Sequence, residues 1–586
     1  MPLRGLTEEQ RVVAEHEGNL LLTACPGSGK TRTLVSKIAY QLSIEEKSNK
    51  KRRIIAITFT NIAADTILDR LDSYGIENSN LWVGTIHSFC LEWIIKPYQG
   101  YSERISKGYR IIDEYEQGKI ILGLKKEFEI NIYDDLPTKL NDDFSINGSS
   151  HTKHYHAATT YHQHLNDNKL IDFDLILTIS IALITNHPEI PQRLGALFSS
   201  ILVDEYQDTN QQQYDILGSI IRHSQTHVTL VGDVDQAIYT GLGAVVKNAE
   251  QIKNEFSLSS INEKTLSGCF RSTQRIIDFY RNFQDTPIDI NSLSNLDPSS
   301  TAVEYTSDIN RDDLGEYVAT LIDKHIDEGV SADEIAVLTP QWFDAINLGA
   351  ALRAARPNLE FNAPGISPIP KGQDNPWINL IRLFFTPICA ANYSRRKRLS
   401  SRVLEDLRSM SFSLSEPNTP IKHILTAINS ITPQEDSTVE VFIDSLISQF
   451  SDFTGLDLAG NLRASEALLA LIGSTTERIS RFNIENNASA LPNYFKGSDG
   501  IDVAVFHSTK GDEYDVVIAT GLVKGKLPHW NDVFAGDEQA DYMARRILYV
   551  VSSRARKYLH LISEQGHKTR RGTPLTPTPQ LINILS

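Results

Sequence analysis

The stretch NLLLTACPGSGKT, residues 19–31, decides the fold of this chain of 586 residues. Its first six residues are almost wholly apolar and predict a buried strand, and the sequence after the glycine-rich turn predicts a helix. Two glycines, Gly27 and Gly29, let the backbone approach phosphate groups where a Cβ atom would collide. Backbone N–H groups and the N-terminus of the following helix then face the negative charge. The stretch therefore predicts a strand, a phosphate-binding loop and a helix, in that order.

The side chains of this loop predict a nucleoside triphosphate site. Lys30 is placed to reach the β- and γ-phosphates, and the Thr31 hydroxyl is placed to bind Mg²⁺. The residues expected to hold the nucleotide here are Gly27, Ser28, Gly29, Lys30 and Thr31. A chance glycine turn is a poor alternative, because a predicted strand and a predicted helix flank the loop.

Two further predicted strands end in polar residues. The first, ILVDEYQD at 201–208, ends in the adjacent carboxylates of Asp204 and Glu205, which repel each other and are not needed for folding. We expect Asp204 to hold Mg²⁺ and Glu205 to orient or deprotonate the attacking water. The second, VGDVDQAIY at 231–239, places Gln236 where it would contact the γ-phosphate. These residues favour an ATPase over a scaffold that merely retains the fold.

The predicted strands are apolar throughout and alternate with helices, which is typical of parallel sheets covered on both faces. We therefore expect an α/β protein with two such domains, each interrupted by a mainly helical insertion. The Pro- and Gly-rich segment 362–376 is expected to be a linker. The expected boundaries are 1–90 and 199–264 for the first domain, 91–198 for its insertion, 265–370 and 491–586 for the second domain, and 371–490 for its insertion.

Composition excludes several other classes of protein. Hydrophobic residues make up 41% and charged residues 22%, the values of an ordinary globular chain. The formal net charge of −16 argues against a wholly cationic surface for duplex DNA, although a local basic groove fits within an acidic whole. The cysteines form no CxxC pair, so neither a zinc ribbon nor an iron–sulfur cluster is indicated. We expect a cytoplasmic protein, since no signal peptide and no run of about 18 apolar residues is present.

Ordered sequence blocks between Leu6 and Arg556 resemble the UvrD/Rep/PcrA group of superfamily-one DNA helicases. They are LTEEQ, ACPGSGKT, ITFTNIAAD, GTIHSFC, LVDEYQDTNQQQ, VGDVDQAIY, CFRS, FHSTKGDEYDVV and YVVSSRAR. The resemblance implies two RecA-like P-loop domains, with ATP hydrolysed between the two lobes. It also implies an ATP-dependent translocase or helicase that moves 3′ to 5′ on single-stranded or tailed DNA.

The resemblance assigns further residues around the nucleotide. Those that would bind the adenosine are Gln10 at the adenine edge, Arg32 and Phe270 on its two faces, and Glu513 at the ribose. The family usually has Tyr at the position of Phe270. Arg271 and Arg554 would act as arginine fingers, which neutralise the charge that develops on the γ-phosphate.

The resemblance also implies a track for single-stranded DNA. Phe59 and Tyr239 would stack on bases, because every base offers a π-face regardless of sequence. Polar contacts to the strand are expected from Thr60, Asn61, Thr85, His87, His507, Ser508 and Lys510. Two basic runs, Lys50 to Arg53 and Arg395 to Arg398, are candidate phosphate contacts, with solvated faces as the alternative. Five histidines between 151 and 164 match no metal-ligand spacing and predict a polar surface.

The chain departs from the family most clearly on the DNA side. Gly241 and Leu242 stand where the family has Trp and Arg, which removes a stacking platform worth about 1–3 kcal/mol per base. An alternative activity is therefore an ATPase that senses DNA ends and switches a partner nuclease without processive unwinding. The anti-phage Gabija system has a helicase-like subunit of this family that works beside a nuclease. Both activities require ATP and Mg²⁺.

Overall fold

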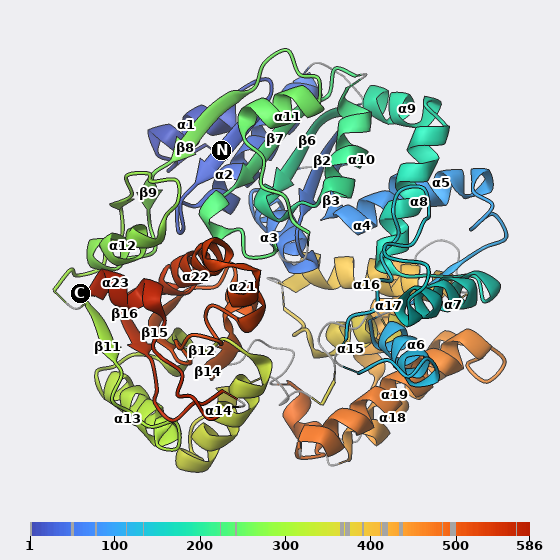
Figure 1. The fold of residues 1–586 in the computed structure, drawn as a ribbon. Helices are drawn as coiled ribbons and strands as arrows, with labels where there is room; N and C mark the ends of the chain where they lie inside the picture. Colours follow the sequence, from blue (N-terminus) through green and yellow to red (C-terminus); the bar gives the residue numbers. More distant parts are fainter. Residues whose placement is uncertain are drawn as a thin grey trace. The chain divides into compact units, whose positions relative to one another are not determined.

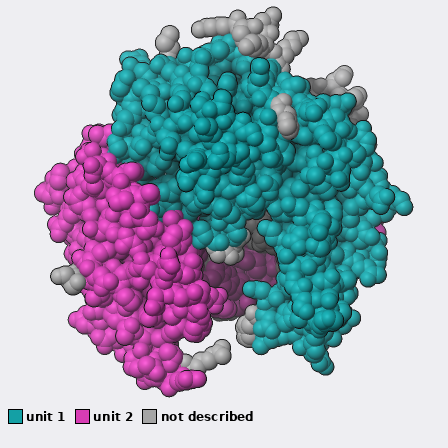
Figure 2. Space-filling view, turned by 45° about the horizontal axis from the view of Figure 1, so that its top comes forward, with its two compact units in different colours: residues 1–267 teal, residues 268–586 magenta. Residues whose placement is uncertain are grey.

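The computed structural model divides into two compact units, residues 1–267 (unit 1) and 268–586 (unit 2), which are coloured separately in Figure 2. The residues that it describes are 3–47, 52–76, 79–112, 114–132, 134–222, 224–240, 243–299, 301–363, 368–369, 375–389, 392–410, 412, 420–432, 437–482, 484–492, 500–569 and 571–585. Within these ranges, no helix is both long and apolar enough to cross a membrane.

Unit 1 is built on a six-stranded sheet in which every neighbouring pair of strands is parallel (Figure 1). The strands, in their spatial order, are β3 (Leu81–Thr85), β2 (Arg53–Thr58), β6 (Phe198–Asp204), β7 (His227–Gly232), β1 (Leu20–Ala24) and β8 (Asn262–Leu266). The predicted parallel sheet is therefore confirmed. Because parallel strands all end at the same edge, the polar residues that follow β1, β2, β6 and β7 gather there.

The apolar strands of this sheet are buried on both faces. Along β1, Leu20 and Leu22 pack on one face, while Leu21 packs on the other, as the two-residue period of a strand requires. One face is covered by α1 (Glu8–Glu15), α2 (Lys30–Lys47) and α3 (Asn61–Ser73). The other face is covered mainly by α4 (Ile86–Phe89), a π-helix (Cys90–Ile95), α8 (Phe173–Asn186) and α10 (Gln211–Ile221).

The segment 91–198 is mainly helical, as predicted, and its apolar residues join the core of the sheet. Its longer helices are α6 (Glu114–Glu127), α7 (Lys153–Asp167), α8 and α9 (Glu189–Leu197). A short parallel ladder of β4 (Arg110–Ile111) and β5 (Leu170–Ile171) lies among them. Tyr161 of α7 and Ile176 of α8 belong to the same buried cluster as Ile55 and Ile201 of the sheet, so this segment shares one continuous core with unit 1.

Unit 2 contains a second six-stranded sheet that is parallel throughout. Its strands, in spatial order, are β11 (Ala302–Thr306), β16 (Ala555–Ile562), β15 (Tyr514–Ala519), β12 (Ile335–Thr339), β14 (Ile501–Val505) and β13 (Phe361–Asn362). The helices that accompany it are α12 (Gln274–Tyr280), α13 (Leu314–Asp327), α14 (Trp342–Ala355), α21 (Trp530–Ala535), α22 (Asp537–Ser552) and α23 (Pro579–Leu585). The second parallel sheet predicted from the sequence is thus also confirmed.

The helical segment inserted in unit 2 has a hydrophobic core of its own. It comprises α15 (Pro376–Phe385), α16 (Tyr393–Ser409), α17 (Pro420–Ser430), α18 (Val439–Thr454) and α19 (Leu462–Phe482), drawn in yellow and orange in Figure 1. Trp377, Phe442 and Phe450 are among its fully buried residues, and its cluster is separate from the one that lines the sheet. Most of the predicted linker 362–376 lies outside the described residues.

Candidate nucleotide and nucleic-acid site

The loop between β1 and α2 has the backbone geometry that its glycines predict. Gly27 and Gly29 have φ values of +70° and +73°, a region that residues with a Cβ atom rarely adopt. The backbone N–H of Ser28 donates to the carbonyl of Cys25 at 3.1 Å and closes the turn. Ser28 is only 2% exposed, and its Oγ has no hydrogen-bond partner among the described residues. A buried hydroxyl of this kind, beside a helix N-terminus, fits a loop that binds phosphate.

Lys30, the first residue of α2, makes an ion pair with one of the two predicted catalytic carboxylates. Its Nζ lies 2.5 Å from Oε1 of Glu205, and Asp204 follows Glu205 as the next carboxylate that acts on it. Burial alone would lower the pKa of Lys30, but the attraction of Glu205 and Asp204 outweighs burial and raises it. Lys30 is therefore held as a cation at the place where phosphate would need one.

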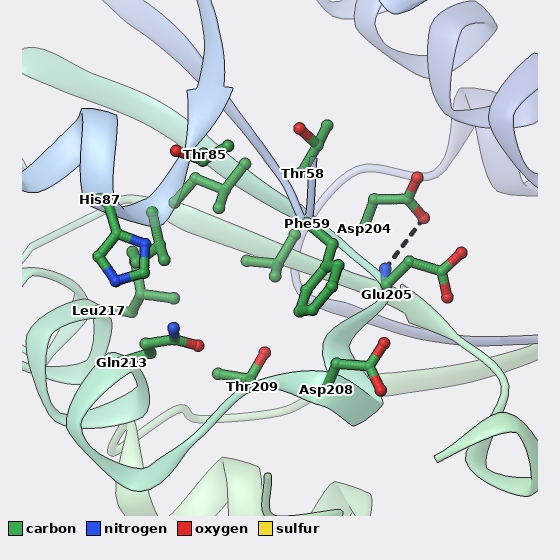
Figure 3. Close-up of a pocket in the computed structure, with 13 residues that line it drawn as sticks. Thr58, Phe59, Thr85, His87, Asp204, Glu205, Asp208, Thr209, Gln213 and Leu217 are labelled. Atoms are coloured by element: carbon green, nitrogen blue, oxygen red, sulfur yellow. Dashed lines mark hydrogen bonds between the residues drawn. The ribbon is translucent and has the colours of Figure 1, made fainter. Parts of the chain in front are cut away.

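The backbone at Glu205 is unusual for a residue with a side chain. Its φ is +54°, in the left-handed region, which costs about 1–3 kcal/mol unless the surroundings hold it there. The backbone N–H of Glu205 donates to Oδ1 of Asp204 at 3.0 Å, as the dashed line in Figure 3 shows. Gln207, which is fully buried, donates from Nε2 to Oε2 of Glu205 at 2.6 Å. The strained turn at the end of β6 thus fixes the direction of the Glu205 carboxylate.

A chain of hydrogen bonds continues from this turn to the loop after β7. Gln207 Oε1 accepts from the backbone N–H of Asp233 at 3.1 Å, and Gln236 donates from Nε2 to Oδ2 of Asp233 at 2.9 Å. A Cβ atom on Gly232 would lie 2.1 Å from Gln207 Oε1, so this close approach requires glycine. The structure therefore links Lys30 and Glu205 to Gln236 through two residues that the sequence analysis did not single out. Their only signal was membership of the blocks LVDEYQD and VGDVDQ.

Gln10 and Arg32 hold the N-terminal segment against the P-loop. Gln10 is 1% exposed, caps α1 together with Thr7, and donates from Nε2 to the carbonyl of Ser28 at 2.9 Å. Arg32 donates from Nη2 to the carbonyl of Gly5 at 3.0 Å. These contacts place both residues beside the nucleotide loop, while their roles at the adenine remain predictions.

The two aromatic residues expected to stack on bases stack on each other. The rings of Phe59, directly after β2, and Tyr239, after β7, have centroids 5.3 Å apart and planes inclined by 22°. Phe59 is 48% exposed, so one face of this pair remains open to a ligand. Figure 3 shows Phe59 with the carboxylates of Asp204, Glu205 and Asp208 to one side of it. Phe59 and these carboxylates thus line one pocket of unit 1.

The predicted polar contacts of unit 1 lie at the ends of neighbouring strands. Thr60 caps α3 and accepts a hydrogen bond from Ala63, and Thr85 caps α4 in the same way by accepting from Ser88. Asn61 is the exposed first residue of α3. His87 lines the pocket with Thr85, and burial lowers its pKa despite the nearby Asp174. In Figure 3, the imidazole ring of His87 lies to the left of Phe59.

In unit 2, the two candidate arginine fingers lie in one hydrogen-bonded group with the candidate ribose contact. Arg271 donates from Nε to Oε2 of Glu513 at 2.8 Å and from Nη1 to the carbonyl of Ser553 at 2.8 Å. Burial would raise the pKa of Glu513, but Arg271 outweighs it and lowers the pKa. Arg554 is 1% exposed and donates to the Val550 carbonyl at 2.9 Å. Phe270, next to Arg271, is 40% exposed.

The predicted DNA contacts of unit 2 follow strand β14. His507 and Ser508 form a 3₁₀ turn directly after the strand, and Lys510 follows it. Burial lowers the pKa of His507, partly offset by Asp532, so a neutral imidazole is favoured there. Ser508 is exposed and donates to the carbonyl of Val505 at 2.9 Å. These residues stand at the carboxyl edge of the second sheet, as their counterparts do in the first.

Three arginines of the two basic runs are held by contacts within the protein. Arg396 of the second run is 5% exposed and donates to the carbonyl of Leu383 at the end of α15, so for this residue the prediction is wrong. Arg52 of the first run donates to the Gly195 carbonyl at 2.9 Å, and Arg53 lies over the ring of Trp93. Arg396 and Arg52 donate to backbone carbonyl oxygens, which need donors where they are buried. Arg53 instead makes a cation–π contact with Trp93. Lys50 and Lys51 lie outside the described residues, as do Gly241 and Leu242.

The histidine-rich segment forms α7 and its approach. Among the described residues, no group of three or more His, Cys, Asp or Glu side chains is arranged to hold a metal ion. His162 lies against the carbonyl of Thr138 at 2.7 Å, and burial lowers its pKa. His151, His156 and His164 are exposed, in agreement with the predicted polar surface.

Comparison with known proteins finds a family model and relatives to which this chain is similar. Residues 6–257 match the family model of the UvrD/REP helicase N-terminal domain. The chain is also similar along most of its length to the ATP-dependent DNA helicases PcrA of two staphylococci. It is 25% identical to PcrA of Staphylococcus epidermidis RP62A over 95% of this chain and 82% of that protein. It is likewise 25% identical to PcrA of Staphylococcus aureus Mu50, over 98% of this chain and 85% of that protein.

Proposed function

Because the chain is a UvrD/Rep/PcrA-like helicase, we propose that it is an ATP-driven motor that moves 3′ to 5′ along single-stranded DNA. The observation that carries this proposal is a single loop, residues 233–240, which joins two kinds of site. Gln236 of the loop ends the hydrogen-bonded chain from Lys30, and Tyr239 of the same loop stacks on the exposed ring of Phe59. A change at the phosphate end is thereby transmitted to the aromatic end.

The residues of unit 1 fit ATP and Mg²⁺ by their chemistry. Gly27 and Gly29 open the loop to phosphate, and the buried Ser28 hydroxyl offers it a further contact. Thr31 and Asp204 supply the oxygen ligands that Mg²⁺ prefers. When bound, MgATP supplies a phosphoanhydride bond whose cleavage drives the motor.

Lys30 would change its partner when ATP binds. It pairs with the Glu205 carboxylate in the structure, and it would release that carboxylate on binding the phosphate oxygens. Gln207 keeps its hydrogen bond to Oε2, so the freed Oε1 remains oriented to take a proton from the attacking water. The left-handed backbone at Glu205 serves the same end, because it fixes where the carboxylate points.

Unit 2 supplies two guanidinium groups that we assign to stabilisation of charge at the γ-phosphate. Arg271 is the better prepared of the two, because its side chain is held from two sides by Glu513 and by the Ser553 carbonyl. Arg554 donates hydrogen bonds to Val550, Ser553 and Asp512, so it must exchange at least one of them in order to act. We therefore assign the larger catalytic effect to Arg271.

On the DNA side, we assign base stacking to Phe59 and Tyr239 and strand contacts to the polar residues at the two sheet edges. Those residues are Thr60, Asn61, Thr85, His87, His507, Ser508 and Lys510. Stacking binds single strands without regard to sequence, because every base has a π-face. A motor that steps along arbitrary sequence needs this property.

Strand displacement tests the proposal. The protein is incubated with ATP, Mg²⁺ and a duplex that carries a single-stranded tail at either its 3′ or its 5′ end. A motor that moves 3′ to 5′ releases the strand from the 3′-tailed duplex and not from the 5′-tailed one. Hydrolysis of ATP with release from neither duplex would contradict the proposal and favour the alternative, a DNA-end-sensing ATPase that switches a nuclease.

A further inference from the structure

A pair of exposed aromatic side chains begins α14 of unit 2. Trp342 is 38% exposed and Phe343 is 65% exposed, and their rings meet edge to face with centroids 5.9 Å apart. Neither residue belongs to the sequence blocks that carry the family resemblance. Two adjacent large aromatic rings in solvent forgo the favourable burial of apolar area, so their exposure calls for a ligand.

Two arginines lie beside this pair. Trp342 packs edge to face on Phe482, the last residue of α19, with ring centroids 5.2 Å apart. The guanidinium groups of Arg478 and Arg481 lie 5.5 Å and 5.3 Å from the centre of the Phe482 ring. Burial and the neighbouring Arg481 both lower the pKa of Arg478, as expected where two cations lie close together. Trp342, Phe343, Arg478, Arg481 and Phe482 are called the α14–α19 cluster below.

The register of the second sheet places this cluster beside the predicted DNA contacts of unit 2. Strands β12 and β14 are parallel, and Thr339 pairs with Val505 as their last matched positions. Trp342 and Ser508 therefore each lie three residues past the same edge of the sheet. The cluster and the 3₁₀ turn of His507 thus leave the sheet at neighbouring strand ends, where ligands of parallel sheets bind.

We propose that the α14–α19 cluster is a second stacking site for single-stranded DNA, with bases on Trp342 and Phe343 and a phosphate at Arg478 and Arg481. This inference rests on the proposed function and adds a binding site to it. An exposed indole is the strongest stacking platform among the side chains, and paired guanidinium groups match the phosphate that accompanies each base. The site gives unit 2 an aromatic stacking platform, of the kind that unit 1 lacks because Gly241 stands where the family has Trp.

Charge complementarity selects this occupant over an apolar partner. The chain as a whole carries a formal charge of −16, yet the cluster sets two guanidinium groups at the ring of Phe482, on which the exposed Trp342 packs. Asp344, the acidic residue next to Phe343, is already paired with Lys526 at 3.0 Å. A ligand with alternating π-faces and negative charges satisfies both features, and single-stranded DNA is such a ligand.

Equilibrium binding of a labelled oligo(dT) of about 20 nucleotides, longer than a typical single-strand site, tests the proposal in the full-length protein. Trp342→Ala is expected to weaken binding about 5- to 150-fold, the loss of one stacked base, and Trp342→Phe should retain most of the affinity. Arg481→Ala should weaken binding and lower the salt dependence by about one counterion. Phe534→Ala removes an aromatic residue of unit 2 that is more exposed than Trp342 and stacks on Trp530, and this variant should bind as the wild type does.

Each other outcome overturns the inference. If Trp342→Ala lowers the thermal unfolding temperature but binds oligo(dT) as the wild type does, the cluster is only a packing contact between α14 and α19. If Trp342→Phe binds as weakly as Trp342→Ala, stacking on this ring is not the cause. If the wild-type protein itself fails to bind oligo(dT), both the proposed function and the second stacking site are wrong. If the wild type binds oligo(dT) and Trp342→Ala binds equally well, only the second stacking site is wrong.

Discussion

The two units carry opposite charges beside opposite edges of their parallel sheets. In unit 1, the carboxyl ends of the strands present carboxylates, and the cation Lys30 is held by one of them. In unit 2, Arg554 and Glu513 directly precede β16 and β15, at the amino edge of the sheet, and Arg271 is held by Glu513 and a backbone carbonyl. Each unit thus keeps its reactive charges paired in its own hydrogen bonds.

The carboxyl edges of the two sheets are alike in their aromatic residues. Phe59 follows β2, whose last residue Thr58 pairs with Thr85 of β3, and Trp342 follows β12 in the same manner. In both units, an exposed ring therefore stands beside a strand end that bears hydroxyl and imidazole groups. The proposed roles therefore assign different parts of the nucleotide chemistry to the two units, and single-strand contact to both.

The largest expected effect tests the division of charge. Arg271→Ala should lower the rate of ATP hydrolysis about 10³-fold or more, because an arginine finger contributes that much to phosphoryl transfer. Arg271→Lys keeps the charge but cannot reproduce the two hydrogen bonds from Nε and Nη1. The rate of ATP hydrolysis by Arg271→Lys should therefore lie between those of the wild type and of Arg271→Ala. Arg311→Ala, a surface arginine of the same unit, is the matched control and should turn over ATP normally. Steady-state ATP hydrolysis under saturating ATP measures all three.

A smaller effect is expected at the carboxylate of unit 1. Glu205→Gln removes the proton acceptor and the partner of Lys30, and should lower ATP hydrolysis about 10²- to 10⁴-fold while ATP still binds. Nucleotide binding, followed with a fluorescent ATP analogue, should be retained, since Lys30 is then free of its ion pair. The exposed Glu116→Gln serves as the control carboxylate in unit 1. A Glu205→Gln protein that hydrolyses ATP at the normal rate would remove Glu205 from the chemistry.

The aromatic pair of unit 1 is expected to contribute less than the catalytic groups. Phe59→Ala should weaken the binding of oligo(dT) by about 1–3 kcal/mol, the usual contribution of one stacked base. Ile62, one turn further along, is 79% exposed and apolar but has no aromatic ring of its own, so Ile62→Ala is the matched control. Equal affinities of the two variants, measured by fluorescence anisotropy, would show that Phe59 does not contact DNA.

The smallest effect concerns acid stability, which should distinguish unit 2. His325 and His560 lie buried with their Nε2 atoms 2.8 Å apart, between Glu328 and Glu304. Burial outweighs Glu304 and lowers the pKa of His560 to about 4, below its unfolded value near 6.5. The unfolded state therefore binds the proton more readily, and stability is lost as the pH falls through this window, by about 2 kcal/mol at pH 5.

Thermal unfolding at pH 7 and pH 5 measures this loss. His560→Gln should show a smaller fall in unfolding temperature between the two pH values than the wild type. His151→Gln removes an exposed histidine of unit 1, and its unfolding temperature should fall between pH 7 and pH 5 by as much as that of the wild type. An equal fall in all three proteins would show that the buried pair does not control acid stability.

Much of the fold could be predicted from the sequence because its signals are local. The apolar run NLLLTA forms β1 to within one residue, and the block ILVDEYQD contributes its first four residues to the end of β6. Both parallel sheets followed from such runs and from their alternation with helices. The P-loop could likewise be recognised because glycine spacing, strand and helix all lie within a few residues.

The parts that could not be predicted depend on contacts between distant residues. Nothing in the sequence states that Lys30 is paired with Glu205 or that Phe59 stacks on Tyr239, since those partners meet only when the strands are side by side. The basic run at Arg395 to Arg398 was misread at Arg396, because a run of charge does not reveal which member faces the end of a helix. Trp342 was overlooked for a similar reason, because a lone Trp after a strand is as typical of a core as of a binding site.

The rate of ATP hydrolysis with and without oligo(dT) decides whether this chain is a motor on single-stranded DNA. We expect saturating oligo(dT) to raise the rate of the wild-type protein severalfold or more, because the loop 233–240 joins Gln236 to the stacked Tyr239. The Lys30→Ala protein should be inactive in both conditions and so shows that the hydrolysis belongs to this site. A wild-type rate that does not change with oligo(dT) would contradict the claim that this chain is a motor driven along single-stranded DNA.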